Sequence, residues 1–171
     1  TVLNDNGKLI GYNTDGYGFM QSVRDAGHDI TGKNITVMGV GGASMAICAQ
    51  SALDGAASVH IFARHTSRYW NRTQKFAENL SAKTGCQVCL FDNDDHTALR
   101  DSIAQSYLLI NATSVGMVPD IDDTIIKDTS LFHPELVVAD VVYEPQETRL
   151  LREAKAAGCQ TFNGMYMLLH Q

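Results

Sequence analysis

The sequence predicts an α/β protein whose single domain is built on a doubly wound parallel sheet. Short apolar, β-branched runs alternate with stretches of helical periodicity from about residue 33 onward. Polar and glycine-rich segments follow the C-terminal ends of several of these runs, and the ligands of such sheets lie across those ends. With 171 residues, the chain has the length of one domain.

The first 30 residues are expected to form a hairpin and a linking helix. Asn4-Asp5-Asn6-Gly7 is a strong turn signal between two short apolar runs. Asn13-Thr14-Asp15 follows, and each of these side chains can cap the start of a helix. Apolar residues keep helical spacing from there to Ala26-Gly27. For Asp15 alone, capping is the simplest interpretation.

The segment from residue 36 to residue 47 reads as strand, tight turn and helix. Gly39 lets the backbone turn sharply, and Gly41 leaves no side chain between the backbone and an incoming pyrophosphate. The helix that follows offers unpaired N–H groups to such an anion. The pattern matches a Rossmann-like dinucleotide fingerprint, except that Ser44 replaces the third glycine. Alone, it is equally compatible with a plain strand-to-helix turn or with a methyltransferase loop for S-adenosylmethionine.

The remaining elements complete a predicted six-stranded parallel sheet in residues 31–171, which we interpret as a dinucleotide-binding domain. Besides the strand before Gly39, strands are expected at residues 59–62, 87–91, 107–110, 136–143 and 161–162. Helices are expected up to about residue 53, at about 68–83, 97–104 and 146–157, and from 164 onward. A polar loop, residues 111–117, follows one strand end.

Composition excludes several functional classes. The net charge of −6 argues against binding nucleic acid or an anionic membrane surface. No apolar run approaches the ~20 residues of a membrane span, and no signal peptide pattern is present. The four cysteines lie in apolar surroundings, typical of free thiols in the cytoplasm. Cys86 and Cys89 lie in an expected strand on opposite faces, so no metal site is predicted.

Five segments together resemble, in order, the shikimate/quinate dehydrogenase family. They are Gly11–Gly16, Gly39–Ala43, Asn111–Met117, Asp140–Pro145 with Thr148, and Gly164–Gln171. The resemblance covers nearly the whole chain, and the ordered set is far more specific than any one motif. It implies the cofactor-binding half of an enzyme that interconverts a cyclic alcohol and its ketone with a nicotinamide cofactor.

The resemblance also implies a role for individual residues. Asp15 matches a catalytic aspartate that pairs with a lysine at the substrate hydroxyl. Tyr143 and Gln171 would hold a small substrate of the shikimate or quinate class; alone, they read as a packing aromatic and a surface amide. The cofactor would contact Gly39, Gly41, Gly42 and Ala43 at its pyrophosphate, and Thr113, Gly164 and Met167 at its nicotinamide end.

NADP is the predicted cofactor, with NAD possible. NAD sites usually place a carboxylate at the end of the second strand, for the ribose hydroxyl. Here that segment carries Arg64 and Arg68 and no carboxylate. Arg64 can stack on the adenine, and Arg68 can reach a 2′-phosphate. The alternative is a pair of solvated arginines at a helix start, where the helix dipole slightly disfavours cations.

The family's substrate domain, with its catalytic lysine and serines, has no counterpart here, and the chain begins at Thr1 without methionine. We therefore expect a piece of a longer protein, monomeric or homodimeric, that alone binds the cofactor weakly and does not turn over substrate. A non-catalytic metabolite sensor with the same domain is the competing hypothesis. Retention of Asp15 weighs against a sensor. A methyltransferase is disfavoured by the arginines where an acidic residue is usual.

Overall fold

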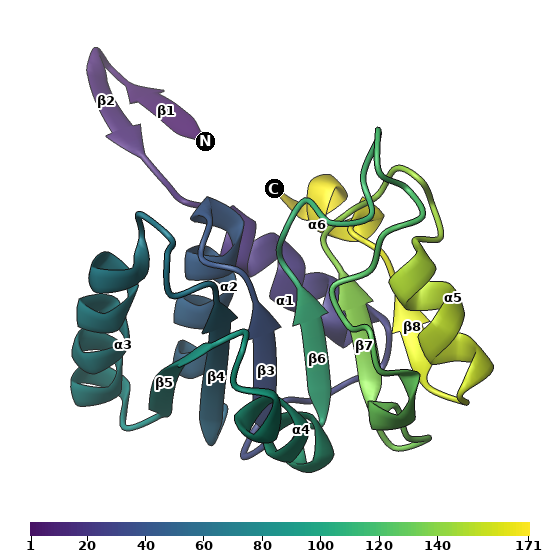
Figure 1. The fold of residues 1–171 in the computed structure, drawn as a ribbon. Helices are drawn as coiled ribbons and strands as arrows, with labels where there is room; N and C mark the ends of the chain where they lie inside the picture. The colour runs from purple at the N-terminus through teal and green to yellow at the C-terminus, as the bar shows by residue number, and fades with distance from the viewer.

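The computed structural model describes residues 1–171, and its core is one six-stranded parallel sheet (Figure 1). The strands are β3 Asn34–Met38, β4 Ser58–Ala63, β5 Gln87–Asp92, β6 Leu108–Asn111, β7 Val137–Asp140 and β8 Gln160–Phe162. Their order across the sheet is β5-β4-β3-β6-β7-β8, and every pairing is parallel. The predicted sheet is therefore confirmed.

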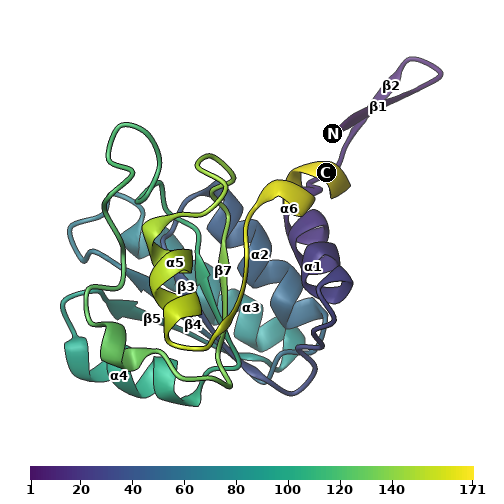
Figure 2. The same cartoon turned by 90° about the vertical axis from the view of Figure 1, so that its right-hand side faces the viewer.

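Helices cover both faces of the sheet (Figure 2). On one face lie α1 Asp15–Asp25, α2 Gly42–Leu53 and α3 Trp70–Thr84, and on the other lie α4 His96–Gln105, α5 Arg149–Ala156 and the short 3-10 helix η1 Thr129–Leu131. A core of 21 buried residues fills the first interface, and one of 12 fills the second. Because the four inner strands β3, β4, β6 and β7 are buried on both faces, their sequences are largely apolar.

The chain reverses its direction of winding between β3 and β6, which are neighbours in the sheet. Met38, at the end of β3, pairs with Phe62 of β4 on one side and with Asn111 of β6 on the other. The segments that follow these three strands therefore leave the sheet side by side, at its upper edge in Figure 1. In doubly wound sheets, the ligand crevice lies at this switch point.

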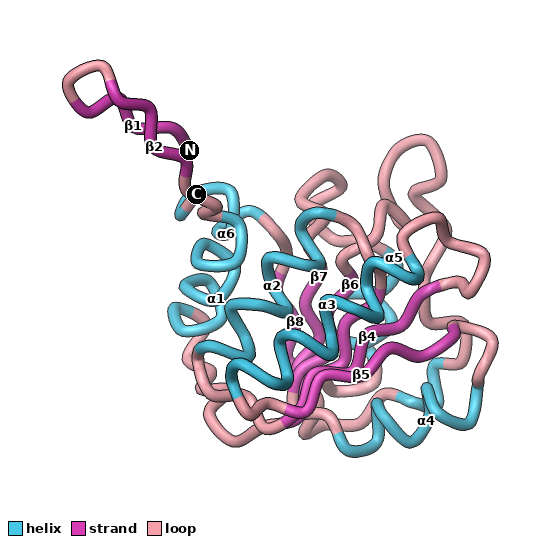
Figure 3. The backbone as a smooth tube through the Cα atoms, turned by 90° about the vertical axis from the view of Figure 1, so that its left-hand side faces the viewer, coloured by secondary structure: helices cyan, strands magenta, loops and turns pink.

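The N-terminal hairpin, β1 Val2–Asp5 and β2 Lys8–Gly11, stands away from the body of the molecule (Figures 1 and 3). Its strands are exposed on both faces, with only Ile10 partly buried. The hairpin and the helix after it form as predicted, but the hairpin does not pack beside the sheet. Only α1 carries an apolar face, so only α1 packs, against α2 and the C-terminal α6 Met165–His170.

Two element boundaries differ from the predictions because side chains fix them. The Thr148 hydroxyl accepts a hydrogen bond from the Leu151 N–H at 3.4 Å, so α5 begins at Arg149 rather than near residue 146. Ser67 accepts from the Tyr69 N–H at 3.3 Å, and α3 begins only at Trp70. All four cysteines are free. None of the helices has the length and apolar character that crossing a membrane requires.

Candidate functional site

The turn after β3 is closed around Gly39. Its φ of +110° suits glycine, and a methyl group there would lie 2.8 Å from the carbonyl oxygen of Ala112. Ser44, which replaces the third glycine of the fingerprint, is fully buried. Its hydroxyl donates a hydrogen bond to the Gly39 carbonyl at 2.6 Å. The serine therefore holds the turn closed from the first turn of α2.

The N-terminus of α2 is open to a ligand. Gly41 is its N-cap, and no side chain caps the helix. A side-chain carbon at Gly41 or Gly42 would meet nothing within 4 Å, so the space in front of these residues is free. The first N–H groups of the helix, including that of half-buried Ala43, have no acceptor within it. Unpaired donors at the positive end of a helix dipole bind anions such as a pyrophosphate.

A cavity of about 760 Å³ lies at the switch point. It is lined from three strand ends: by Gly39 and Gly41 after β3, by Arg64 and Arg68 after β4, and by Thr113 after β6. Its volume is in the usual range for small-molecule sites. The structure thus brings together five residues that the sequence marked as cofactor-binding.

The two predicted arginines differ in how they are held. Arg68 donates a hydrogen bond to the Tyr69 hydroxyl at 2.6 Å, and its guanidinium lies 4.7 Å from the centre of that ring. The Arg64 side chain is exposed and makes no hydrogen bond or ion pair within the chain. The sequence missed a nearby carboxylate, that of Asp92, because only strand pairing brings β5 here. Asp92 accepts from the His65 N–H at 3.3 Å.

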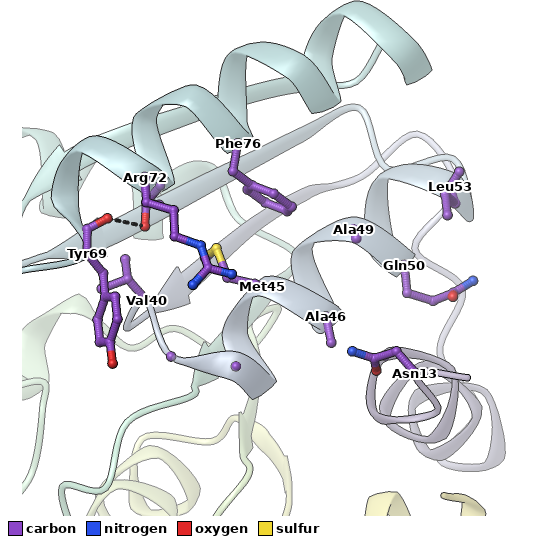
Figure 4. A pocket seen from close by; sticks show the side chains of 14 residues that line it. Asn13, Val40, Met45, Ala46, Ala49, Gln50, Leu53, Tyr69, Arg72 and Phe76 are labelled. Carbon is purple, nitrogen blue, oxygen red and sulfur yellow. Dashed lines mark hydrogen bonds between the residues drawn. The ribbon is translucent and has the colours of Figure 1, made fainter. Parts of the chain in front are cut away.

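A second cavity, of about 480 Å³, lies on the other side of the glycine turn, between α2 and α3 (Figure 4). It shares Gly41 and Tyr69 with the first cavity. Arg72 extends from α3 into it, toward the N-terminal end of α2 (Figure 4). Sequence reasoning missed Arg72, because it lies within the first turn of α3, beyond the strand-end segment that carries Arg64 and Arg68.

Thr113 and Tyr143 meet at a small cavity of about 150 Å³. Thr113 is held by Asn111, whose Oδ1 accepts from the Thr113 N–H at 3.1 Å and from its hydroxyl at 2.6 Å. Tyr143 is 45% exposed, and both the packing and the substrate-binding interpretation of this side chain stay predictions. Thr113 also lines the large cavity, so the cavity that contains the predicted cofactor-binding residues and the one that contains Tyr143 share this residue as a wall.

Asp15 is the first residue of α1, and its half-buried carboxylate accepts no hydrogen bond and forms no ion pair within the chain. Thr14 is the N-cap, without a side-chain cap bond, and Asn13 Oδ1 accepts from the Asp15 N–H at 3.1 Å. The interpretation of Asp15 as a helix cap therefore has no support in its contacts. The carboxylate remains available for chemistry.

The three C-terminal residues with predicted binding roles lie in packing contacts and line none of the cavities described above. A methyl group at Gly164 would lie 2.0 Å from the Val141 carbonyl oxygen, so this close approach needs a glycine. Met167 is 5% exposed and belongs to the larger core. Gln171 is exposed at the end of α6, next to Gly18 of α1. The binding roles of these three residues stay predictions. No group of three or more His, Cys, Asp or Glu side chains is arranged to hold a metal.

The strand order, the glycine turn, the uncapped helix and the cavity at the switch point define an α/β domain of the Rossmann type, a fold in which dinucleotides typically bind at this crevice. No family model matches the sequence. Over its full length, however, the chain is 48% identical to a shikimate dehydrogenase (NADP(+)) of Listeria innocua and 40% identical to a quinate/shikimate dehydrogenase of Escherichia coli. Over its whole length, the chain is therefore similar to members of the shikimate/quinate dehydrogenase family.

A solved structure agrees with these sequence relatives. The crystal structure of a shikimate 5-dehydrogenase from Listeria monocytogenes, in complex with shikimate and NAD, matches with a TM-score of 0.95 and 47% identity. The match covers 99% of this chain and 58% of that one. The chain likewise spans 58% and 59% of the two curated relatives.

Proposed function

We propose that this chain is the cofactor-binding part of an oxidoreductase that transfers a hydride between NADP(H) or NAD(H) and a cyclic hydroxy acid of the shikimate or quinate class. The observation that carries the proposal is the uncapped N-terminus of α2, which opens behind Gly39 onto a cavity lined by Arg64, Arg68 and Thr113. The names of the relatives, and the shikimate and NAD bound to one of them, support it.

The residues present fit a dinucleotide. The N–H groups at the start of α2 would hold the pyrophosphate, with the open space at Gly41 and Gly42 allowing contact with the backbone. When bound, the nicotinamide ring supplies the carbon that accepts or returns the hydride. Thr113 and Tyr143, which share a cavity wall, would orient the ring and the substrate on either side of that carbon.

Asp15 would manage the proton of the substrate hydroxyl. Oxidation of an alcohol removes a hydride from carbon and a proton from oxygen, and a lysine held by a carboxylate can accept that proton. None of the lysines of this chain lies in a motif that matches the family's catalytic lysine. We place that lysine in the part of the relatives that this chain does not span, so the chain alone should bind cofactor without oxidising shikimate or quinate.

NADP should be preferred over NAD. Arg64, Arg68 and Arg72 lie around the glycine turn, and the nearby Asp92 carboxylate already accepts a backbone N–H. A hydrogen bond to a charged group contributes about 1.5–3 kcal/mol, and an exposed contact lies at the low end. Since 1.4 kcal/mol is tenfold in affinity, NADP should bind about tenfold more tightly. The relatives do not settle this, because one is named for NADP(+) and another holds NAD.

Fluorescence titration of the purified chain with NADPH and NADH tests both cofactor binding and the preference for NADP. Arg68→Ala should remove most of the preference, whereas Arg100→Ala, on α4 away from the cavity, should leave it unchanged. The preference should shrink as salt rises, because the contact is electrostatic and exposed. Equal binding of the two cofactors would refute the NADP assignment alone. Binding of neither would refute the proposed function.

The catalytic role of Asp15 is tested in the longest natural protein that contains this sequence. Asp15→Asn should lower kcat by about 10²–10⁴-fold, the usual contribution of a positioned acid–base group. Cofactor affinity should stay nearly constant. Asn and Asp cap helices about equally well, so an unchanged kcat would mean a structural role for Asp15. A wild type that binds shikimate but never reduces the cofactor would favour the metabolite sensor.

A further inference from the structure

We propose that Asp140 is a positioning residue for the nicotinamide side of the cofactor cavity. Its buried carboxylate sets the orientation of the Asn111 side-chain amide, and Asn111 in turn holds Thr113 against the glycine turn. The inference rests on the proposed function, because it assigns the residue a role toward the same cofactor. It concerns a residue that touches neither of the two cavities that Thr113 lines.

Asp140 ends β7 and is fully buried, yet no cationic side chain contacts it. Its Oδ1 accepts from Asn111 Nδ2 and from the Val142 N–H, both at 3.0 Å. Its Oδ2 accepts from the Thr148 hydroxyl at 2.8 Å. Burial raises the pKa of this carboxyl group, while the three donors favour its ionised form. The carboxylate is thus bound only by neutral donors.

The acceptor oxygen of Asp140 acts together with the Val115 carbonyl oxygen and the Thr113 N–H to give the Asn111 amide one satisfactory orientation. An ionised carboxylate only accepts hydrogen bonds, so the NH₂ group of Asn111 must face it. The same NH₂ group donates to the Val115 carbonyl oxygen at 3.1 Å. The amide oxygen consequently faces Thr113 and accepts from both its N–H and its hydroxyl. A neutral amide at position 140 would replace the carboxylate acceptor by a weaker one and so loosen the bond that holds the Asn111 NH₂ group.

The orientation matters because the Thr113 loop forms a wall of the cofactor cavity. The Thr113 methyl carbon and the Ala112 carbonyl oxygen lie so close to Gly39 that a methyl group there would be 2.9 and 2.8 Å from them. Thr113 also reaches the small cavity that contains Tyr143. On that side, the Val142 N–H ties the residue before Tyr143 to the same carboxylate. One buried charge therefore holds both walls.

A purely structural role would be met better by an apolar side chain. Buried charges carry a large desolvation cost, and well-packed apolar replacements are often neutral or stabilising. The core on this side of the sheet includes Val138 and Leu150, and Asp140 carries the only carboxylate among the buried residues. A carboxylate retained there is explained by the orientation it imposes on Asn111 and Thr113.

The test compares two ligands that differ at the nicotinamide end. NADPH reaches the Thr113 wall, whereas 2′,5′-ADP contains only the adenosine half with its 2′-phosphate. In Asp140→Asn, the affinity for NADPH should fall by about tenfold, as expected for a lost hydrogen-bonded charge, while the affinity for 2′,5′-ADP stays within about twofold. Both are measured by titration calorimetry on the purified chain, with the thermal midpoint recorded for each variant.

Thr148→Val is the matched control. It removes another donor to the same carboxylate, together with the N-cap bond of α5, but leaves Asn111 in place. It should lower the thermal midpoint without changing the ratio of the two affinities. If Asp140→Asn does not fold, Thr113→Val removes the hydroxyl bond to Asn111, leaves the backbone bond in place, and should show the selective loss of NADPH affinity. Thr113→Ser, which keeps the hydroxyl, should restore it.

The outcomes separate the two proposals. A wild-type chain that binds neither ligand refutes the proposed function. The other outcomes apply when the wild-type chain binds both ligands. If the folded Asp140→Asn variant then keeps the wild-type affinities, or loses affinity for both ligands equally, only the role of Asp140 is refuted. When only the Thr113 variants fold, the role of Asp140 is refuted by an unchanged NADPH affinity in Thr113→Val. It is also refuted if Thr113→Ser loses as much NADPH affinity as Thr113→Val.

Discussion

Gly39 and Gly41 lie two positions apart in the same turn, yet the structure requires them for different reasons. Gly39 has a positive φ and touches the Ala112 backbone, so its lack of a side chain serves the fold. Gly41 has a φ of −78°, and a side chain there would meet no atom within 4 Å. We propose that its lack of a side chain serves the ligand instead.

Alanine at these two positions should therefore separate stability from binding. Gly39→Ala should lower the free energy of unfolding by at least about 1–3 kcal/mol, because strained backbone and a close contact are combined. Gly41→Ala should cost less than about 1 kcal/mol, the difference between these residues at an N-cap, while NADPH affinity falls at least about tenfold. Urea denaturation and cofactor titration measure the two effects. A Gly41→Ala variant with unaltered affinity would place the pyrophosphate elsewhere.

Residues with a local signature were predictable from the sequence, and residues defined by strand pairing were not. Gly39, Arg64 and Thr113 each follow an apolar run directly, so a parallel sheet brings them to one cavity. Asp92 reaches this edge only because β5 lies beside β4, and no motif marks that order. Asp140 lay within a recognised motif, but only the structure shows that its carboxylate is buried and bound to Asn111.

At the scale of elements, the contact between α1 and α2 fixes the position of Asp15 relative to the glycine turn. A methyl group at Gly16 would lie 2.3 Å from the carbonyl oxygen of Ala46 in α2. Gly16 directly follows Asp15 and lines the cavity between α2 and α3, so the spacing of the two helices sets the position of the carboxylate relative to α2. The sequence predicted both helices, but not that their backbones touch.

Gly16→Ala should lower stability even though alanine is the better helix former. Alanine gains about 1 kcal/mol in helix propensity over glycine, but here α1 must move away from α2. We expect a net loss of at least about 1 kcal/mol, or a thermal midpoint about 2–4 °C lower for a chain of this size. Tyr17→Ala, at a side chain 53% exposed on the same helix, is the control and should change little. A midpoint that rises in Gly16→Ala would show that the two helices separate without cost.

At the scale of the whole molecule, two histidines couple folding to pH. His28 is buried and bonds to the Tyr107 hydroxyl at 2.8 Å, and His60 bonds to the Ser102 hydroxyl at 2.9 Å. Burial lowers the pKa of both imidazoles below the ordinary value of 6.5. The unfolded chain therefore binds more protons than the folded chain just below that pH. Burial raises the pKa of Asp140, which opposes this trend only in the acidic range.

The free energy of unfolding should consequently fall as the pH drops through about 6.5. Each histidine contributes at most about 1.4 kcal/mol per pH unit, the limit for one proton taken up on unfolding. Urea denaturation between about pH 7.5 and pH 5.5 measures the slope, and His28→Gln should make it shallower. His96→Gln, at an exposed residue, should leave it unchanged. A flat profile in the wild type would mean that both rings are protonated as readily in the folded chain.

The hairpin that stands off the body divides the molecule into two regimes of amide exchange. Two isolated strands are only marginally stable in water, and β1 and β2 pair with nothing else. Their amide protons should exchange with solvent through local opening, at a free energy near zero. Those of β3, buried between β4 and β6, should exchange only through global unfolding. Leu3→Ala should therefore leave the slow exchange of β3 and the denaturation midpoint of the sheet unchanged, because protection from solvent begins only beyond Tyr12.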